Sequence, residues 1–246
     1  MPSKPKATAY FTPELFRFMR ALARNNSREW FLENKARYEA QVREPALRLI
    51  ADMAAPLSTI TPQLVADPKK VGGSLFRIHR DTRFSGDKTP YKTHVGISFH
   101  HAATKAVARS EGSNAAMGRL DAPVLYLHIQ PGASFIGGGI WHPQPDTLKL
   151  IRDYLLNNPK SWKEATRAPH LPKGWEMAGE ALSRPPRGYD PKHELIDDLK
   201  RKDFIASAEI SEEDLLSPDL PKILIKRYRG IAPLYDWLCG ALDLEF

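Results

Sequence analysis

The apolar residues of this chain change their spacing twice, and this change limits the folds that it can adopt. Over residues 10–60 they recur every three or four positions, as on one side of an amphipathic helix. Over residues 70–142 they fall into short alternating runs, which are typical of strands, and over residues 145–246 helical spacing returns. The predicted fold is therefore α+β, with a central, mostly antiparallel sheet and helices from the N- and C-terminal segments.

Two runs carry the strand pattern most clearly. In the run that ends in VGISFH, Val95, Ile97 and Phe99 point one way, and four residues point the other way: His94, Gly96, Ser98 and His100. In VLYLHI the apolar set Leu125, Leu127 and Ile129 alternates against Tyr126 and His128. LFRIHR and SFIGGGIW are further predicted strands, and glycines are expected to bend the second one strongly.

Length and composition indicate one globular unit. We expect residues 1–9 to form a flexible arm and residues 10–246 to form a single domain. The chain has 246 residues, of which 42% are hydrophobic and 26% are charged, which is enough to bury a core. A single cysteine, Cys239, excludes an internal disulfide, and the start of the chain lacks the apolar region of a secretory signal. These features predict a cytoplasmic protein without a membrane segment.

The net charge of +7 and the pI of about 9.4 favour an anionic partner. The lysines and arginines are scattered along the chain, often beside acids, so no basic block points to nucleic acid in particular. An anionic small molecule is the expected partner, and nucleic acid is the alternative. The oligomeric state is left open.

One connection between predicted strands concentrates charge. Residues 80–94 read RDTRFSGDKTPYKTH. Five cations at candidate binding positions fall within residues 77–92: Arg77, Arg80, Arg83, Lys88 and Lys92. Arginine binds carboxylate or phosphate oxygens in pairs, and lysine adds a compact charge, so these side chains and Tyr91 predict an anion site. In this hypothesis Asp81 and Asp87 are the catalytic candidates, as general bases or as holders of an arginine or a metal.

A structural interpretation competes with this one. Asp81 and Asp87 would cap turns and pair with neighbouring cations, Thr89-Pro90 would set the entry to the next strand, and Phe84 and Tyr91 would pack the loop on the core. Exposed ion pairs of this kind contribute little to stability.

The other candidates are weaker. Gly138 and Gly139, in a run of three glycines, could offer backbone N–H groups to an anion, but the run has no nucleotide-binding spacing and also suits a bulge. Six of the eight histidines lie between residues 79 and 142 without metal-ligand spacing, so no metal site is predicted from them. A Mg²⁺ ion held by Asp81 or Asp87 together with a phosphate stays open, and the cofactor is otherwise unknown.

These segments resemble a known family. FRIHRDTRFSGDKTPYKTHVGISF is similar to the central signature of the uncharacterised bacterial and fungal family called domain of unknown function 2461. Three further segments agree with it: LARNNSREWFLENKARYE, YLHIQPGASFIGGGIWHPQPDTLKLIR and LSRPPRGYDPKHELIDDLKRKDF. The resemblance covers about residues 10–240, implies no established reaction, and includes the charged stretch in the family pattern. His79 and His94 resemble variable positions of that pattern, which argues against histidine catalysis, and the connection 102–122 resembles a longer version of the family's own.

Three functions follow from these observations. The leading hypothesis is a basic Arg/Asp/Lys/Tyr pocket that binds a phosphorylated or carboxylated small molecule, with enzymatic action on it left open. The second is a nucleic-acid-binding module without catalysis. The third is a structural or protein-interaction role, in which the ion pairs only hold the hairpin.

Overall fold

The computed structural model describes residues 8–83, 86–104 and 121–246. Its N-terminal part is helical, as the spacing predicts, with elements α1 (Pro13–Arg24), α2 (Arg28–Glu33), α3 (Lys35–Tyr38), the π-helical η1 (Glu39–Arg43) and α4 (Glu44–Ser58). Ser27 caps α2, because its hydroxyl accepts a hydrogen bond of 3.2 Å from the backbone N–H of Trp30. Pro45 lies in the first turn of α4, directly after η1, and the backbone at Arg43 and Glu44 between the two elements is helical.

The sheet contains six strands among the described residues: β1 (Leu64–Val65), β2 (Val95–His101), β3 (Val124–Ile129), β4 (Phe135–Ile140), β5 (Glu176–Ala178) and β6 (Phe204–Glu209). Their order is β1-β2-β3-β4-β6-β5, and each neighbouring pair is antiparallel. The predicted α+β class is confirmed. The predicted strand LFRIHR pairs only at isolated positions, Leu75 with Ile97 and His79 with Tyr91.

The two last strands lie in the segment 145–246, which the spacing predicted to be helical. β6 reads FIASAE, and its small alanines and serine give a weak alternating pattern. It nevertheless lies between β4 and β5, because pairing with β4 over six residues supplies the backbone hydrogen bonds that a lone segment of this composition lacks.

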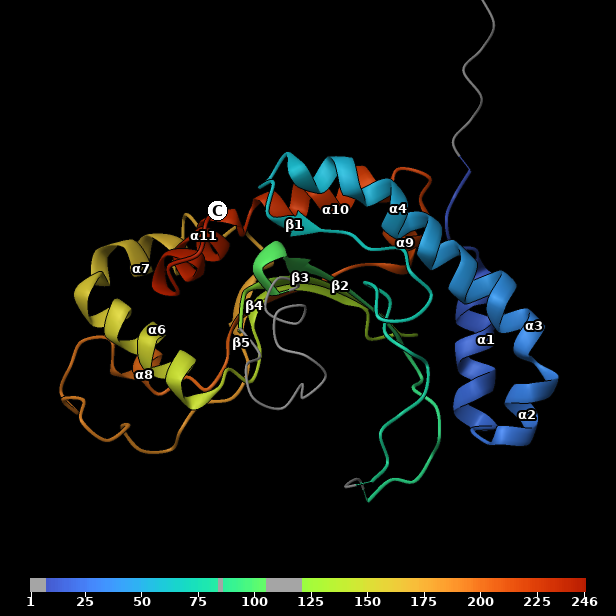
Figure 1. Ribbon diagram of the computed structural model, residues 1–246, viewed down its shortest axis with the longest axis horizontal. Coiled ribbons are helices and arrows are strands. Elements are labelled where there is room, and N and C mark those ends of the chain that lie inside the picture. Colours follow the sequence, from blue (N-terminus) through green and yellow to red (C-terminus); the bar gives the residue numbers. More distant parts are fainter. Residues whose placement is uncertain (1–7, 84–85, 105–120) are drawn as a thin grey trace, which may run out of the picture.

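The remaining helices are α6 (Pro145–Asn157), α7 (Pro159–Thr166), α8 (Ile196–Leu199), α9 (Glu212–Leu216), α10 (Leu220–Arg229) and α11 (Ala232–Ala241). Helices α4, α10 and α11 cover one face of the sheet, as Figure 1 shows. The apolar residues of the strands point into this layer, and Ile97, Phe99 and Leu127 are fully buried there.

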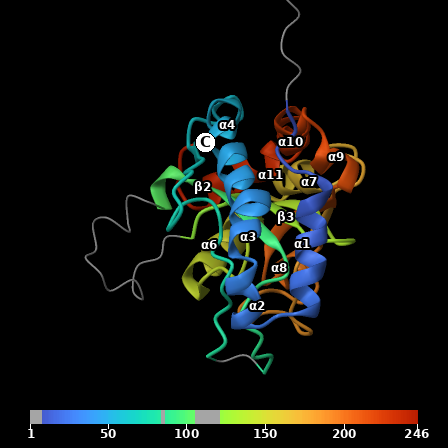
Figure 2. The ribbon, with the colours of Figure 1, turned by 90° about the vertical axis from the view of Figure 1, so that its right-hand side faces the viewer.

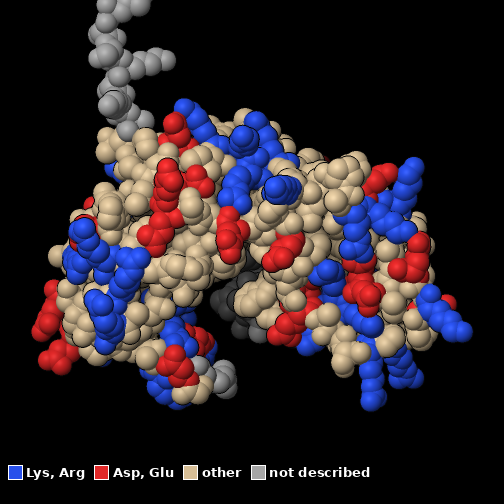
Figure 3. Space-filling view, turned by 180° about the vertical axis from the view of Figure 1, so that it is seen from behind, with Lys and Arg blue, Asp and Glu red and all other residues tan. Residues whose placement is uncertain are grey.

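The opposite face of the sheet carries the polar half of the alternation, and we call it the open face. Ser98, Tyr126, His128 and Phe135 lie on it and are half-buried. In Figure 1 this face looks down, between α1–α3 on one side and α6 and α8 on the other. Figure 3 shows a hollow on this side of the surface. The chain from β1 to β2 descends beside α2 and α3 at the rim of the face, as Figure 2 shows from the side.

Candidate functional site

Residues 77–92, which we call the charged hairpin, fold back on themselves as the sequence predicts. The backbone N–H of Arg80 donates to the carbonyl of Pro90 at 2.9 Å, and that of Lys92 donates to the carbonyl of Ile78 at 2.8 Å. These bonds bring residues 78–80 beside residues 90–92. Phe84 and Ser85, at its turn, lie outside the described residues, so the packing predicted for Phe84 is not addressed.

The tip of the hairpin pairs its own charges. Asp81 accepts two hydrogen bonds from the Arg83 guanidinium, at 3.0 Å to Nε and 2.7 Å to Nη2, and Asp87 pairs with Arg80. The Lys88 ammonium donates to the carbonyl of Thr82 at 2.9 Å. The carboxylates therefore hold arginines, one of the roles that the sequence suggested for them.

The same contacts keep both aspartates ionised. Hydrogen bonds from the side chain and backbone of Arg83 lower the pKa of Asp81. The backbone N–H of Thr89, followed by Arg80, lowers the pKa of Asp87 to about 2. A general base works best with a pKa near the working pH, so this geometry favours orientation of arginines over proton transfer. The catalytic role of Asp81 and Asp87 stays a prediction.

Tyr91 anchors the hairpin to the helical layer. Its ring is buried and stacks on Phe31 of α2 with ring centroids 4.1 Å apart. The Asn26 side chain clamps its backbone, because the amide nitrogen donates to the carbonyl of Tyr91 at 2.9 Å and the amide oxygen accepts from its N–H at 3.1 Å. The structure thus places Tyr91 in the core instead of on the surface of the hairpin.

The base of the hairpin differs from its tip. Lys92 is half-buried, its ammonium lies 5.3 Å from the ring centroid of Phe76, and burial together with the charge of Arg77 lowers its pKa. Among the described residues, no carboxylate forms an ion pair with Arg77 or Lys92; Asp81 lies within reach of the charge of Arg77 but pairs with Arg83. Two neighbouring cations therefore stand here without a paired carboxylate.

Phe76 leads from these cations onto the open face. It lies 5.8 Å from Tyr126, which lies 5.8 Å from Phe135, and Phe135 stacks on His128 at 4.6 Å, all measured between ring centroids. We call Phe76, Tyr126, His128 and Phe135 the ring row. It crosses the sheet from the rim of β2 to β4.

Hydrogen bonds orient the middle of the ring row. His128 Nε2 lies 2.9 Å from Oε1 of Gln130, and because an amide oxygen only accepts, Nε2 carries the hydrogen. His128 Nδ1 then accepts from the Tyr126 hydroxyl at 3.2 Å. Burial raises the pKa of Tyr126 to about 12 and lowers that of His128, so both rings are neutral near pH 7.

His94 adds a second imidazole, with its ring centroid 4.3 Å from that of His128. Burial, followed by the nearby His128, Lys92 and Arg80, lowers the pKa of His94 to about 4. A protonated His94 would stand among other cations, so this corner of the open face keeps neutral imidazoles beside charged lysine and arginine.

Gly138 and Gly139 serve packing inside the sheet. Both are buried; a Cβ on Gly138 would lie 2.4 Å from Cδ1 of Ile231, and one on Gly139 would lie 2.0 Å from the carbonyl oxygen of Phe204. Gly139 also has a φ of +126°, a backbone conformation that residues with a side chain rarely adopt. The register with β3 and β6 runs through both glycines without an inserted residue, so the strand has no bulge there and the glycines allow close packing instead. Their part in anion binding stays a prediction.

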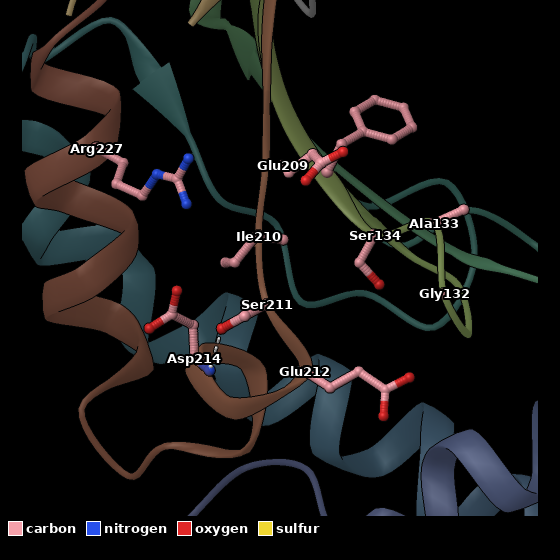
Figure 4. Close-up of a pocket in the computed structure, with 10 residues that line it drawn as sticks. Gly132, Ala133, Ser134, Glu209, Ile210, Ser211, Glu212, Asp214 and Arg227 are labelled. Carbon is pink, nitrogen blue, oxygen red and sulfur yellow. Dashed lines mark hydrogen bonds between the residues drawn. The ribbon is translucent and has the colours of Figure 1, made fainter. Parts of the chain in front are cut away.

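A pocket of about 680 Å³ lies beyond the end of the ring row. Figure 4 shows Ser134 from the β3–β4 turn, Asp214 from α9 and Arg227 from α10 around it. Glu209 and Glu212 add further negative charge, and Glu212 also pairs with Arg20 at 3.1 Å. None of the residues predicted to bind an anion lines this pocket, and its excess of carboxylates makes it a poor anion site.

The described ranges hold no group of three or more histidine, cysteine or acidic side chains placed to bind a metal. In the same ranges, no helix has the length and apolar character needed to cross a bilayer.

The prediction of site residues missed the ring row. The alternation placed Tyr126 and His128 on one face of a strand, but nothing in the local pattern shows that α4, α10 and α11 cover the other face or that Phe76 and Phe135 lie beside these two rings. The alternation in β3 carries a signal that could have found the ring row. On the face opposite the core it places an aromatic ring and an imidazole, where a strand exposed to solvent usually has charged residues.

The comparisons with known proteins agree with the resemblance seen in the sequence. No match to the chain was found among the curated proteins or among the solved structures. One family model, described as "Conserved hypothetical protein (DUF2461)", matches residues 14–237, which include all the helices and strands described above except the last residues of α11 and the start of α1. The chain is therefore a member of the DUF2461 family of conserved hypothetical proteins.

Proposed function

We propose that this protein binds a phosphorylated or carboxylated small molecule at the base of the charged hairpin, on the rim of the open face. Arg77 and Lys92 are the charge partners that we assign to its phosphate or carboxylate group. The sequence spread the predicted site over residues 77–92, and this proposal centres it on the base of the hairpin.

The observation that carries the proposal is this pair of cations, with which no carboxylate of the described residues forms an ion pair. The half-buried Lys92 ammonium lies 5.3 Å from the ring centroid of Phe76, and its burial together with the charge of the exposed Arg77 lowers its pKa. An anion between them would offset the repulsion between the two charges, and charge-assisted hydrogen bonds to phosphate or carboxylate are among the strongest in proteins. At the tip, by contrast, Asp81 and Asp87 already form ion pairs with Arg83 and Arg80.

The test is titration calorimetry with ribose 5-phosphate at low ionic strength. We expect Lys92→Met to weaken binding about 10- to 100-fold, because a hydrogen bond to a charged group contributes about 1.5–3 kcal/mol. Lys88→Met is the matched control, since Lys88 lies in the same hairpin but is exposed at the tip. Absence of binding to ribose 5-phosphate and to citrate, used as a carboxylate probe, would refute the proposal.

The alternative functions give different results in the same experiment. A nucleic-acid-binding module would prefer an oligonucleotide, with affinity that falls steeply as salt rises. A purely structural hairpin would bind none of the probes. Figure 3 shows acidic and basic side chains interspersed over one side of the molecule, which supports a local anion site over an extended basic surface. The cytoplasmic location, the Mg²⁺ requirement and any reaction stay predictions or open questions.

A further inference from the structure

The open face next to the proposed anion site carries small residues around Tyr126. In the register of the sheet, Tyr126 lies between Ser98 of β2 and Gly137 of β4, and Gly137 lies beside Ser207 of β6. Small residues therefore flank the ring of Tyr126 on both sides, and no bulky neighbour in this register row stands over it.

Two glycines lie beside the ring of Tyr126 or in its register row. Gly137 is buried, and a Cβ on it would lie 3.3 Å from the carbonyl oxygen of Ala206. A Cβ on Gly96 would lie 2.7 Å from the Tyr126 hydroxyl and 3.0 Å from Cδ2 of Phe76, so the absence of a side chain lets both rings lie over β2. The rings are thus accommodated against the sheet instead of projecting into water.

The two ends of the ring row differ in the sign of the charges beside them. Lys92 and Arg77 lie at its Phe76 end, whereas Glu209 is paired in register with Phe135 at the other end. An elongated ligand would place its anionic group beside Lys92 and its uncharged part along the rings. Neutral aromatic faces bind flat unsaturated rings by stacking.

We infer that the anion bound at the base of the hairpin is a phosphate ester of a planar heterocycle, that is, a free mononucleotide or a close chemical relative. This inference rests on the proposed function and adds the ring to it. A free mononucleotide fits better than a single strand, because a strand needs cations along its whole path and this face has them at one end only.

The test compares three probes that differ by one part each: adenosine 5′-monophosphate, ribose 5-phosphate, which lacks the base, and adenosine, which lacks the phosphate. With the wild-type protein we expect adenosine 5′-monophosphate to bind about 5- to 100-fold more tightly than ribose 5-phosphate, as stacking of one base allows. Tyr126→Leu should abolish this preference. Tyr126→Phe keeps the ring and should keep the preference.

Each other result has a clear meaning. Equal affinity for the two phosphates would overturn the inference while leaving the proposed function intact, and no binding of either phosphate or of citrate would overturn both. Tighter binding of an oligonucleotide with a steep salt dependence would overturn the choice of a free nucleotide. If Tyr126→Leu does not fold, Phe135→Leu takes its place; an unchanged preference in a folded variant would overturn the role of the ring row.

Discussion

The tip of the charged hairpin and the ring row of the open face are opposite in how their polar groups are satisfied. At the tip, Asp81 holds Arg83, Asp87 holds Arg80, and all the partners come from within a few residues in the chain. Along the ring row, Tyr126 and His128 are neutral, half-buried and hydrogen-bonded to each other, beside a cation that no described carboxylate pairs with.

The comparison shows that density of charge in a sequence is a weak guide to a binding site. Opposite charges that are close in the chain form ion pairs with each other in an exposed loop, so they attract a charged ligand less strongly. Groups brought together by strand pairing have no such local partners. The sheet sets their geometry, and a ligand can supply the charge or hydrogen-bond partner that no neighbouring residue in the chain provides.

Tyr91→Ala should have the largest effect, because it removes the anchor that holds the hairpin beside the open face. Its buried ring stacks on Phe31, so we expect a loss of about 3–5 kcal/mol in the free energy of unfolding, as for other large aromatic truncations in cores. Urea denaturation measures it, with Lys88→Ala as the control at the exposed tip. Equal stability of the two variants would show that the hairpin is not anchored in this way.

Gly138→Ala and Gly137→Ala sharpen the contrast between the two faces of one strand. The first places a methyl group against Ile231 and Leu125, so we expect it to cost about 1–3 kcal/mol. The second would place its Cβ 3.3 Å from the carbonyl oxygen of Ala206, a milder contact, so we expect a smaller loss of stability. Thermal unfolding of both variants checks the pair, and the reverse order would mean that the open face is the packed one.

Lowering the pH should reduce the stability of the protein through His94 beside the ring row, and not through the two aspartates at the tip of the hairpin. Its pKa is about 4 in the folded protein and about 6.5 in the unfolded chain. Between these values the unfolded state takes up the proton, so stability falls as the pH falls from 6.5 towards 4. The two carboxylates at the tip stay ionised over this range.

His94→Gln should make the loss of stability between pH 7 and pH 5 smaller. Because the imidazole is only half-buried, we expect the difference in slope to stay below about 1.4 kcal/mol per pH unit, the limit for one proton. Urea denaturation at the two pH values measures it. Identical slopes for the variant and the wild type would show that His94 is not desolvated.

Arg83→Ala should have the smallest effect. The Arg83–Asp81 pair is exposed and closes a local turn, so we expect no measurable change in the melting temperature or in the affinity for ribose 5-phosphate. Unfolding of this variant would favour the structural role of the hairpin. A loss of phosphate affinity in a stable variant would return the binding site to the tip.

The sequence by itself determined the features that depend on near neighbours. Ser27 and Ser211 cap helices because each hydroxyl reaches a backbone N–H three residues on, and the alternation in β2 and β3 sorts side chains between two faces without reference to the rest of the chain. The α+β class and the family follow from such local patterns taken in order along the chain.

Only the tertiary structure decided which face of the sheet is covered, which cations remain unpaired and that the weakly patterned segment 204–209 becomes an inner strand. Each of these depends on residues far apart in the sequence, such as Asn26 with Tyr91 or Gly137 with Ser207. The physical reason is that desolvation and pairing depend on neighbours in space: the same lysine is a solvated charge at position 88 and a half-buried one beside Phe76 at position 92.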